Sequence, residues 1–81
     1  MAKLRTLSGR EVCAILAQHG YGEIRQRGSH IIMQKKTEDS TITIPISNHK
    51  EIRTGTLISI IRQSRLDRSI FEAGKSSETN N

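Results

Sequence analysis

The residues of this chain best suited to chemistry lie together in one short segment, Arg25-Gln26-Arg27-Gly28-Ser29-His30. Histidine both accepts and donates protons near neutral pH, because the unperturbed imidazole pKa is about 6.5. Arginine stays charged and binds phosphate oxygens through a forked set of N–H donors. A histidine held beside such donors suits cleavage of a phosphodiester backbone, with the imidazole as the base that deprotonates a ribose 2′-OH. We therefore take His30 as the candidate catalytic residue.

The same residue types also have structural explanations. A histidine at the start of a strand can face solvent or pack on a helix, and His49 can stabilise the polar loop in which it stands. His19 falls at the end of a predicted helix, where the helix dipole favours a cationic ring. Ser29 directly precedes His30, so in an extended chain the two side chains point to opposite faces and a Ser–His relay is not expected. Turn formation explains Ser29 better.

Further basic side chains are candidates for contacts with phosphate. Lys35 stands in the strand-like run that follows His30, and Lys50 is next to His49. Each can equally be an ordinary solvated charge. The candidate RNA-binding residues are therefore Arg25, Arg27, Ser29, Lys35, His49 and Lys50.

Length and charge limit the class of protein. The 81 residues predict one small domain, and 13 basic against 8 acidic residues give a formal net charge of +5. This excess favours an anionic partner, either nucleic acid or an acidic protein, without choosing between them. We expect residues 1–73 to form the domain and residues 74–81, which are mostly polar, to form a disordered tail.

Cysteine and apolar content exclude several other classes. With Cys13 as the single cysteine, no intrachain disulfide can form, and the sequence has neither a Cys-x-x-Cys pair nor a His-x-x-x-His helix motif. We therefore expect no metal site and no cofactor, and we expect Cys13 to be a small core residue. No apolar run is as long as a signal peptide or a membrane span, which predicts no membrane association and a reducing, cytoplasmic setting.

The elements that must position the candidate site begin with a helix. Ser8 and Glu11 form a Ser-x-x-Glu capping box, and Gly20 is a natural residue to follow a helix end. A helix is thus predicted from about residue 9 to 19, with Leu7 and Val12 placed to form a hydrophobic staple.

Three strands and a second helix follow. The strands are predicted at 21–27, 30–35 and 40–46, with Gly28-Ser29 as a tight turn and Pro45 marking an edge strand or a strand end. A polar loop at 47–53 leads to a helix at about 55–64, for which Thr54 is the expected cap, and Asp67 caps a short final helical turn. The order helix, three-stranded antiparallel sheet, helix predicts an α+β fold with both helices on one sheet face, the order of the double-stranded-RNA-binding fold.

Several segments carry a resemblance to a known family. They are Leu7-Ser8-Gly9-Arg10-Glu11, Leu16 with Gly20-Tyr21, Arg25 to His30, Ile44-Pro45, Asn48-His49-Lys50-Glu51-Ile52, and Gly55-Thr56-Leu57 with Ile60-Ile61-Arg62-Gln63. In these segments, which extend from about residue 4 to 72, the chain resembles the HicA (YcfA-like) toxins of bacterial type II toxin–antitoxin systems.

The resemblance implies a double-stranded-RNA-binding-like fold and mRNA interferase activity. The lack of a metal-ligand cluster in the sequence predicts that this activity is metal-independent. The resemblance also implies a HicB-type antitoxin that covers the active site, so the toxin is expected as a monomer when free and as a hetero-oligomer with its antitoxin. The catalytic histidine of the family corresponds to His30, and a second family histidine corresponds to His49. Two other hypotheses remain open, namely a non-catalytic RNA-binding module of the same fold and a basic adaptor that binds only an acidic protein.

Overall fold

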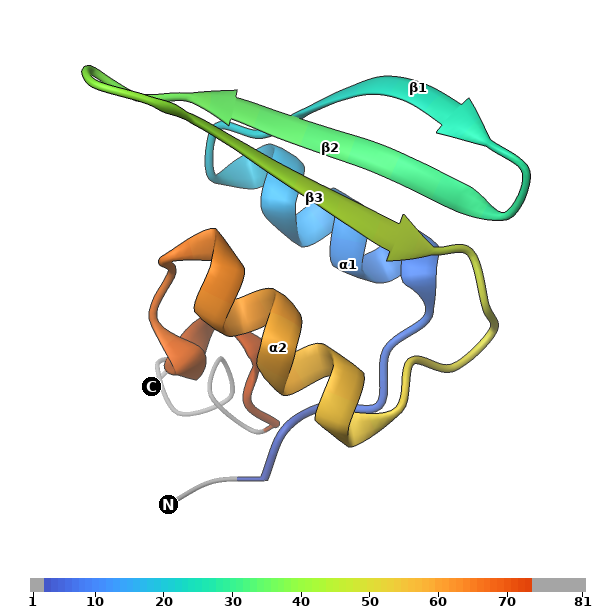
Figure 1. Ribbon diagram of the computed structural model, residues 1–81. Helices are drawn as coiled ribbons and strands as arrows, with labels where there is room; N and C mark the ends of the chain where they lie inside the picture. Colours follow the sequence, from blue (N-terminus) through green and yellow to red (C-terminus); the bar gives the residue numbers. More distant parts are fainter. Residues whose placement is uncertain (1–2, 74–81) are drawn as a thin grey trace.

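The computed structural model describes residues 3–73 and confirms the α+β fold (Figure 1). The elements in chain order are α1 (Gly9–Gln18), β1 (Gly22–Arg27), β2 (His30–Lys36), β3 (Thr41–Ser47), α2 (Thr54–Ser64) and the 3-10 turn η1 (Arg68–Phe71). Each predicted helix and strand is present, with bounds that differ by one residue or not at all. The expected tail at 74–81 lies outside the described residues.

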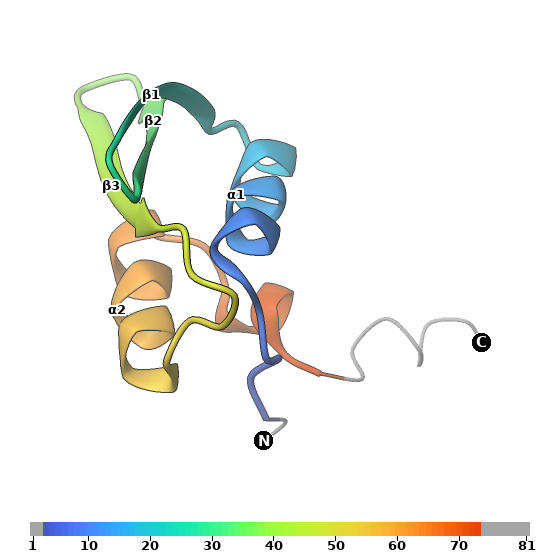
Figure 2. The same cartoon turned by 90° about the vertical axis from the view of Figure 1, so that its right-hand side faces the viewer.

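The strands form one antiparallel sheet in the order β1-β2-β3, so β1 and β3 are its edges. Both helices lie on the same side of this sheet, with α1 behind the strands and α2 below β3 (Figures 1 and 2). Alternate residues of the central strand, Ile31 and Met33, are buried against the helices. Among the described residues the core contains fourteen buried side chains, including Leu16, Ile44, Leu57 and Phe71, and it occupies the space between the two layers. Within residues 3–73, no helix or strand covers the other face of the sheet (Figure 2).

The predicted signals for α1 are confirmed atom by atom. The Glu11 N–H donates to the Ser8 hydroxyl oxygen at 3.0 Å, and the Ser8 N–H donates to the Glu11 carboxylate at 2.8 Å. The staple residues Leu7 and Val12 are both buried. Gly20 follows the helix with a φ of +96°, a conformation that other residues adopt only with strain. Capping and core contacts therefore agree on where this helix begins and ends.

The prediction that Thr54 caps α2 is wrong by one position. Thr54 is the first helical residue, and Arg53 stands at the cap with an extended backbone and no side-chain capping bond. The Arg53 carbonyl already accepts the Leu57 N–H at 2.9 Å. A hydroxyl cap stabilises a helix less than tertiary packing of its apolar face does, and here the burial of Leu57 and Ile60 sets the position of α2. At η1 the prediction is confirmed, since Asp67 accepts the Ser69 N–H at 2.9 Å.

One buried hydrogen bond connects the sheet to the end of α2. The Tyr21 hydroxyl donates to the Ser64 carbonyl oxygen at 2.9 Å. Both residues are buried, and burial raises the pKa of the Tyr21 hydroxyl. Tyr21, which lies between α1 and β1, thus links this connection to the end of α2 across the core.

Candidate functional site

A two-residue turn places the candidate base beside an arginine. Gly28 has a φ of +57° and Ser29 a negative φ, the combination typical of a type II′ hairpin turn with glycine in the first central position. Arg27 and His30 are therefore directly paired across β1 and β2, and His30 is paired with Ser47 of β3. Side chains of directly paired residues lie on the same face of a sheet, so Arg27, His30 and Ser47 form one row, which we name the end row.

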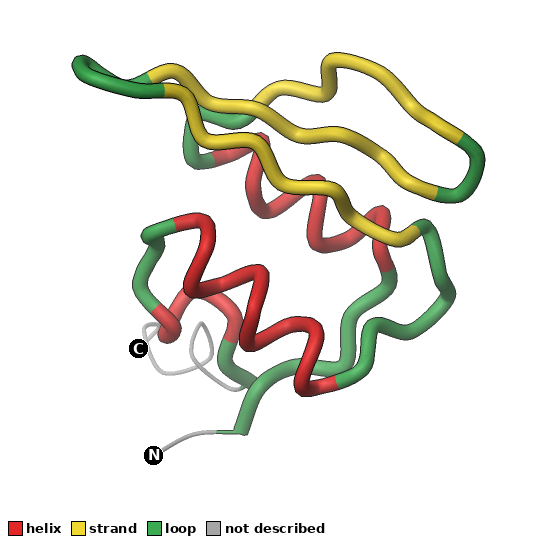
Figure 3. Tube along the Cα trace, in the orientation of Figure 1, coloured by secondary structure: helices red, strands yellow, loops and turns green. Residues whose placement is uncertain are grey.

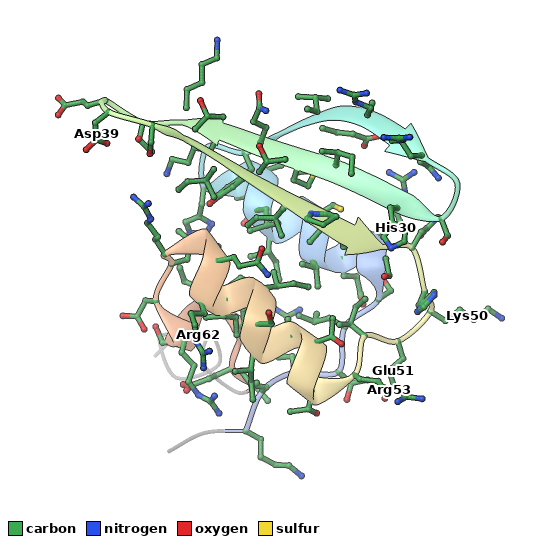
Figure 4. All side chains as sticks on the ribbon, viewed as in Figure 1. His30, Asp39, Lys50, Glu51, Arg53 and Arg62 are labelled. Atoms are coloured by element: carbon green, nitrogen blue, oxygen red, sulfur yellow. The ribbon has the colours of Figure 1, made fainter. Side chains whose placement is uncertain are left out.

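The end row lies on the uncovered face of the sheet. Its neighbours in β2 and β3, Ile31 and Ile46, are fully buried on the helix face, and alternation along a strand puts His30 and Ser47 on the opposite face. The side chains of His30 and Arg27 are exposed. Figure 4 shows His30 at the end of the sheet, next to the loop that follows β3. The imidazole is therefore accessible to a polynucleotide.

Arg25 adds a second cation to this face. It is paired with Ile32, one step along the strands from the end row, and a β-bulge at Ile24 precedes it. Because the bulge lies before Arg25 rather than between the two arginines, both keep the face that period-two alternation predicts. Within residues 3–73 neither arginine forms an ion pair. Both positive charges are therefore available to an anion.

The loop after β3 is held against the hairpin turn. The Asn48 N–H donates to the Ser29 carbonyl oxygen at 2.7 Å, and the Gly9 N–H donates to the His49 carbonyl oxygen at 2.9 Å. Figure 3 shows this loop running beside the segment that leads into α1. A Cβ at Gly9 would collide with the Ser47 carbonyl oxygen, so only glycine permits this approach. The start of α1 thus fixes the loop next to the end row.

His49 lies close enough to share a substrate with His30. It is two residues beyond Ser47, so its Cα lies at most about 13 Å from that of His30, by consecutive Cα spacing and the strand separation. It lines a polar pocket of about 280 Å³ together with Ser47, Glu51, Ile52, Arg53 and Thr56. Lys50 extends from the same loop into solvent (Figure 4). His49 and Lys50 therefore belong to the loop that follows the end row, and the pocket that His49 lines extends toward the start of α2.

Lys35 is not part of this arrangement. It is five residues from His30 along β2, which corresponds to about 16 Å at the usual rise of a strand. Its amine lies 5.7 Å from the centre of the Tyr21 ring, and its side chain passes Gly20. Ser29 contributes its carbonyl oxygen to the loop contact, and the His19 ring is hydrogen-bonded to the Ile15 carbonyl oxygen at 2.9 Å. Arg25 and Arg27 thus share the sheet face of His30, His49 and Lys50 lie in the loop after β3, and Lys35 lies farther along β2.

Sequence reasoning missed two residues that shape the site. Ser47 enters the end row through the register of β3, and only its period-two relation to Pro45 could have indicated its face. Arg10 of α1 reaches the helix side of β1, where it lies 3.3 Å from the Glu23 carboxylate and 3.2 Å from the Gln26 side-chain oxygen. No local pattern predicts this bridge, because it depends on how α1 crosses the bulged strand.

Other site types find no support in the part of the chain that the structure describes. Residues 3–73 contain no group of three or more His, Cys, Asp or Glu side chains arranged to hold a metal ion. None of the helices in this range has the length and apolar character needed to cross a membrane. Cys13 is buried, and its burial raises the thiol pKa, as expected for a core cysteine. What remains is an exposed imidazole beside two unpaired guanidinium groups.

Comparison with known proteins adds the family. Neither the curated proteins nor the solved structures include a match to this chain. A family model described as the HicA toxin of bacterial toxin–antitoxin systems matches residues 9–66, a range that contains both helices and all three strands. The end row and the loop with His49 lie within the matched range. From this match and from the fold, the chain belongs to the HicA family of toxins of bacterial toxin–antitoxin systems.

Proposed function

We propose that this toxin is an endoribonuclease that cleaves mRNA with His30 as the general base. The observation that carries the proposal is the end row, in which an exposed imidazole stands beside Arg27 with Arg25 one step away. The imidazole accepts the proton of a ribose 2′-OH, and the 2′ oxygen attacks the adjacent phosphorus. The bond from phosphorus to the 5′ oxygen breaks, leaving a 2′,3′-cyclic phosphate on one product and a 5′-hydroxyl on the other.

The two arginines stabilise the charge that forms during this step. The phosphorane carries more negative charge than the starting phosphodiester, and fixed cations favour that state most strongly. Guanidinium groups on neighbouring rows of one sheet face can bind two non-bridging oxygens, or two successive phosphates, without moving the strands. Arg25 and Arg27 are therefore assigned to the phosphate, with Ser29 shaping the turn that holds Arg27 next to His30.

The departing 5′ oxygen must receive a proton. His49 and a water molecule bound by an arginine are the two candidate donors, and His49 is favoured by its place in the loop beside the end row. Lys50 in the same loop is assigned to a neighbouring phosphate. Two histidines on either side of the scissile phosphate would give acid and base from one residue type.

The partner follows from the family and the charge. We infer that a HicB-type antitoxin binds this chain and covers the end row, forming a hetero-oligomer with a toxin that is a monomer when free. The formal charge of +5 favours an acidic partner surface and fast association. Because both mRNA and its translation are cytoplasmic, that compartment is the proposed location.

A single substitution tests the catalytic assignment. His30→Ala should lower the rate of RNA cleavage at least about 100-fold, the usual contribution of a general base. Its melting temperature should change by only a few degrees, because replacing an exposed side chain usually alters stability by less than about 0.5 kcal/mol. The matched control is His19→Ala, which removes a histidine outside the site and should leave the cleavage rate unchanged. Cleavage by His30→Ala at the original rate would refute the assignment.

The chemistry of the products tests the mechanism separately. Cleavage should persist in EDTA, the fragments should carry 5′-hydroxyl ends, and a 2′-deoxy nucleotide at the scissile position should block the reaction. Fragments with 5′-phosphate ends would contradict attack by the 2′-OH even if His30 proved essential. RNA binding without cleavage would instead favour the non-catalytic module of the same fold.

A further inference from the structure

The sheet has two edges, and they differ in their ability to accept another strand. Arg27 and His30 close a two-residue hairpin, and such a closing pair exchanges both of its main-chain hydrogen bonds. Backbone groups alternate in direction along a strand, so Ile31 directs its N–H and C=O toward β3 and is bonded to Ile46. The nitrogen of Pro45, one residue earlier in β3, therefore lies on the outer edge. This edge lacks a donor at its middle, a common protection of edge strands.

The outer edge of β1 has no such protection near the hairpin. By the same alternation, the N–H and C=O of Gln26 point away from β2. All six residues of β1 are exposed, and the strand contains no proline. The bulge at Ile24 limits regular pairing to the half of the strand near the turn, and it leaves the Ile24 side chain 46% exposed. The half that remains regular is the half that carries Arg25 and Arg27.

A groove lies under this edge, on the helix side of the sheet. It has a volume of about 290 Å³ between α1 and the start of β1, and small side chains leave it open. Its lining includes Cys13, Ala14, Ala17, Tyr21, Gly22 and Met33. The Arg10 guanidinium also borders it, where it contacts Glu23 and Gln26. The groove is thus apolar at its base and charged at its margin.

We propose that the outer edge of β1 is a strand-addition site for an extended segment of a protein partner in which acidic residues alternate with small apolar residues. Side chains of an added strand would alternate between the two faces of the sheet. Those on the helix side would lie beside the Arg10 guanidinium at Gln26 and would enter the groove by Ala14 and Ala17 where the segment continues past the bulge. Those on the uncovered face would lie next to Arg25 and Arg27. Opposite charges across adjacent strands stabilise the pairing, whereas like charges oppose it.

This mode of binding would also affect RNA. Carboxylates placed beside Arg25 and Arg27 would occupy the cations assigned to phosphate, so the added strand and RNA would exclude each other without any partner residue touching His30. The identification of the antitoxin as the occupant rests on the function proposed above. The open edge and the groove are features of the structure and do not depend on that proposal.

Amide hydrogen exchange of the full chain bound to the HicB-type antitoxin proposed above tests the site directly. In the free chain, prepared as His30→Ala to avoid toxicity, the Gln26 amide should exchange rapidly because it has no partner in β2, whereas the Arg27 amide should exchange slowly. In the complex, exchange at Gln26 should slow by about tenfold or more, as for an amide that joins a sheet. Arg27 serves as the internal control, because strand addition leaves its hydrogen bond unchanged.

A pair of substitutions separates the main chain from the side chain. Gln26→Pro removes the outward N–H and should weaken antitoxin binding by about tenfold or more, the effect of one lost hydrogen bond together with a steric clash. Gln26→Ala keeps the N–H and should bind within about threefold of the unmodified chain. A proline is tolerated at an edge position whose N–H faces solvent. If Gln26→Pro fails to fold, the exchange measurement on the chain without this substitution still decides the question.

Three results would overturn the proposal. One is a complex in which Gln26 still exchanges rapidly, and another is the absence of any complex with that antitoxin. The third is protection of Gln26 that appears in the free chain as its concentration rises, which would identify a second copy of this chain as the occupant. Loss of RNA cleavage plays no part in these outcomes. Protection of Gln26 in a complex whose toxin never cleaves RNA would uphold the edge site and refute the proposed enzyme.

Discussion

Replacing Gly9 by alanine should loosen the contact that holds the loop after β3 in place. A Cβ at this position would collide with the Ser47 carbonyl oxygen and lie 3.0 Å from the Asn48 Cα. Both obstacles are backbone atoms, which cannot swing aside as a flexible side chain can. The start of α1 must then move away from the end of β3. This movement also breaks the hydrogen bond of 2.9 Å from the Gly9 N–H to the His49 carbonyl oxygen.

The size of the effect follows from these two contacts. Overpacking against fixed atoms costs about 1–3 kcal/mol, and a lost backbone hydrogen bond costs about 1 kcal/mol. The higher helix propensity of alanine returns at most about 1 kcal/mol. The free energy of unfolding should therefore fall by about 2 kcal/mol, which lowers the melting temperature of a domain of this size by about 8–16 °C. Thermal and urea unfolding followed by circular dichroism, in the His30→Ala background, measures both quantities.

Gly55 supplies a control of the opposite sign. It also stands in the first turn of a helix, but a Cβ there would meet no atom within 4 Å. Gly55→Ala should therefore leave stability unchanged or raise it by up to about 1 kcal/mol. A Gly9→Ala variant that melts within about 2 °C of the parent chain would refute the close approach of α1 to the loop. Equal destabilisation by both substitutions would point to a general effect of helix glycines instead.

Three further predictions concern the core and the uncovered face. Tyr21→Phe should lower the free energy of unfolding by about 1–3 kcal/mol, because the buried Ser64 carbonyl oxygen loses the hydroxyl donor that lies 2.9 Å away. Urea unfolding measures this free energy, and an unchanged midpoint would exclude the hydrogen bond from Tyr21 to Ser64. Burial raises the pKa of both Cys13 and Tyr21, so the folded state favours their neutral forms, and their contribution to stability should be complete below the ordinary pKa values of 9.0 and 10.0 and lost as the pH rises beyond them. A Cys13→Ala, Tyr21→Phe double variant should therefore lose less stability at alkaline pH, as measured by urea midpoints from pH 7 to 11. Arg27→Ala should reduce the slope of log affinity against log salt for single-stranded RNA by about 0.7, the value of one phosphate contact, whereas Lys35→Ala, outside the site, should leave the slope unchanged in the same fluorescence titration.

The elements of this fold are predictable because their signals are local. The bonds between Ser8 and Glu11, the positive φ of Gly20 and the two-residue turn at Gly28-Ser29 each involve residues within a few positions of one another. Period-two alternation likewise placed Arg25 and Arg27 on one face, and the turn placed Arg27 beside His30. The chemistry of the end row could be inferred from sequence because one hairpin contains most of it.

What could not be predicted depends on contacts between distant segments. The close approach of Gly9 to Ser47 needs the angle between α1 and the sheet, and the bridge from Arg10 to Glu23 and Gln26 needs the bulge at Ile24. Tertiary packing also decided one helix boundary against local preference. Thr54 is a good cap by residue type, yet it became helical because core burial determines where α2 begins.

Lys35 shows a further limit of sequence reasoning. Its charge is indistinguishable in sequence from that of Lys50, but the structure places it five residues from His30 along β2, with its amine near the Tyr21 ring. Alternation along β2 puts Lys35 on the sheet face of Ile31 and Met33, opposite that of His30, whereas its position beside Tyr21 depends on tertiary packing that no sequence pattern gives.

Because all six residues of β1 are exposed, selection for recognition by this strand can act separately from selection for core packing. Substitutions at the buried positions of the other strands and of the helices must preserve the shape of a small core, and few of them will be neutral. Substitutions in β1 change charge and main-chain recognition while the core stays intact, because the strand contributes no buried side chain to it. Under the proposed function, related toxins would diverge in RNA preference and in partner choice through this strand alone. A toxin and its antitoxin would then become specific for each other while each keeps its fold.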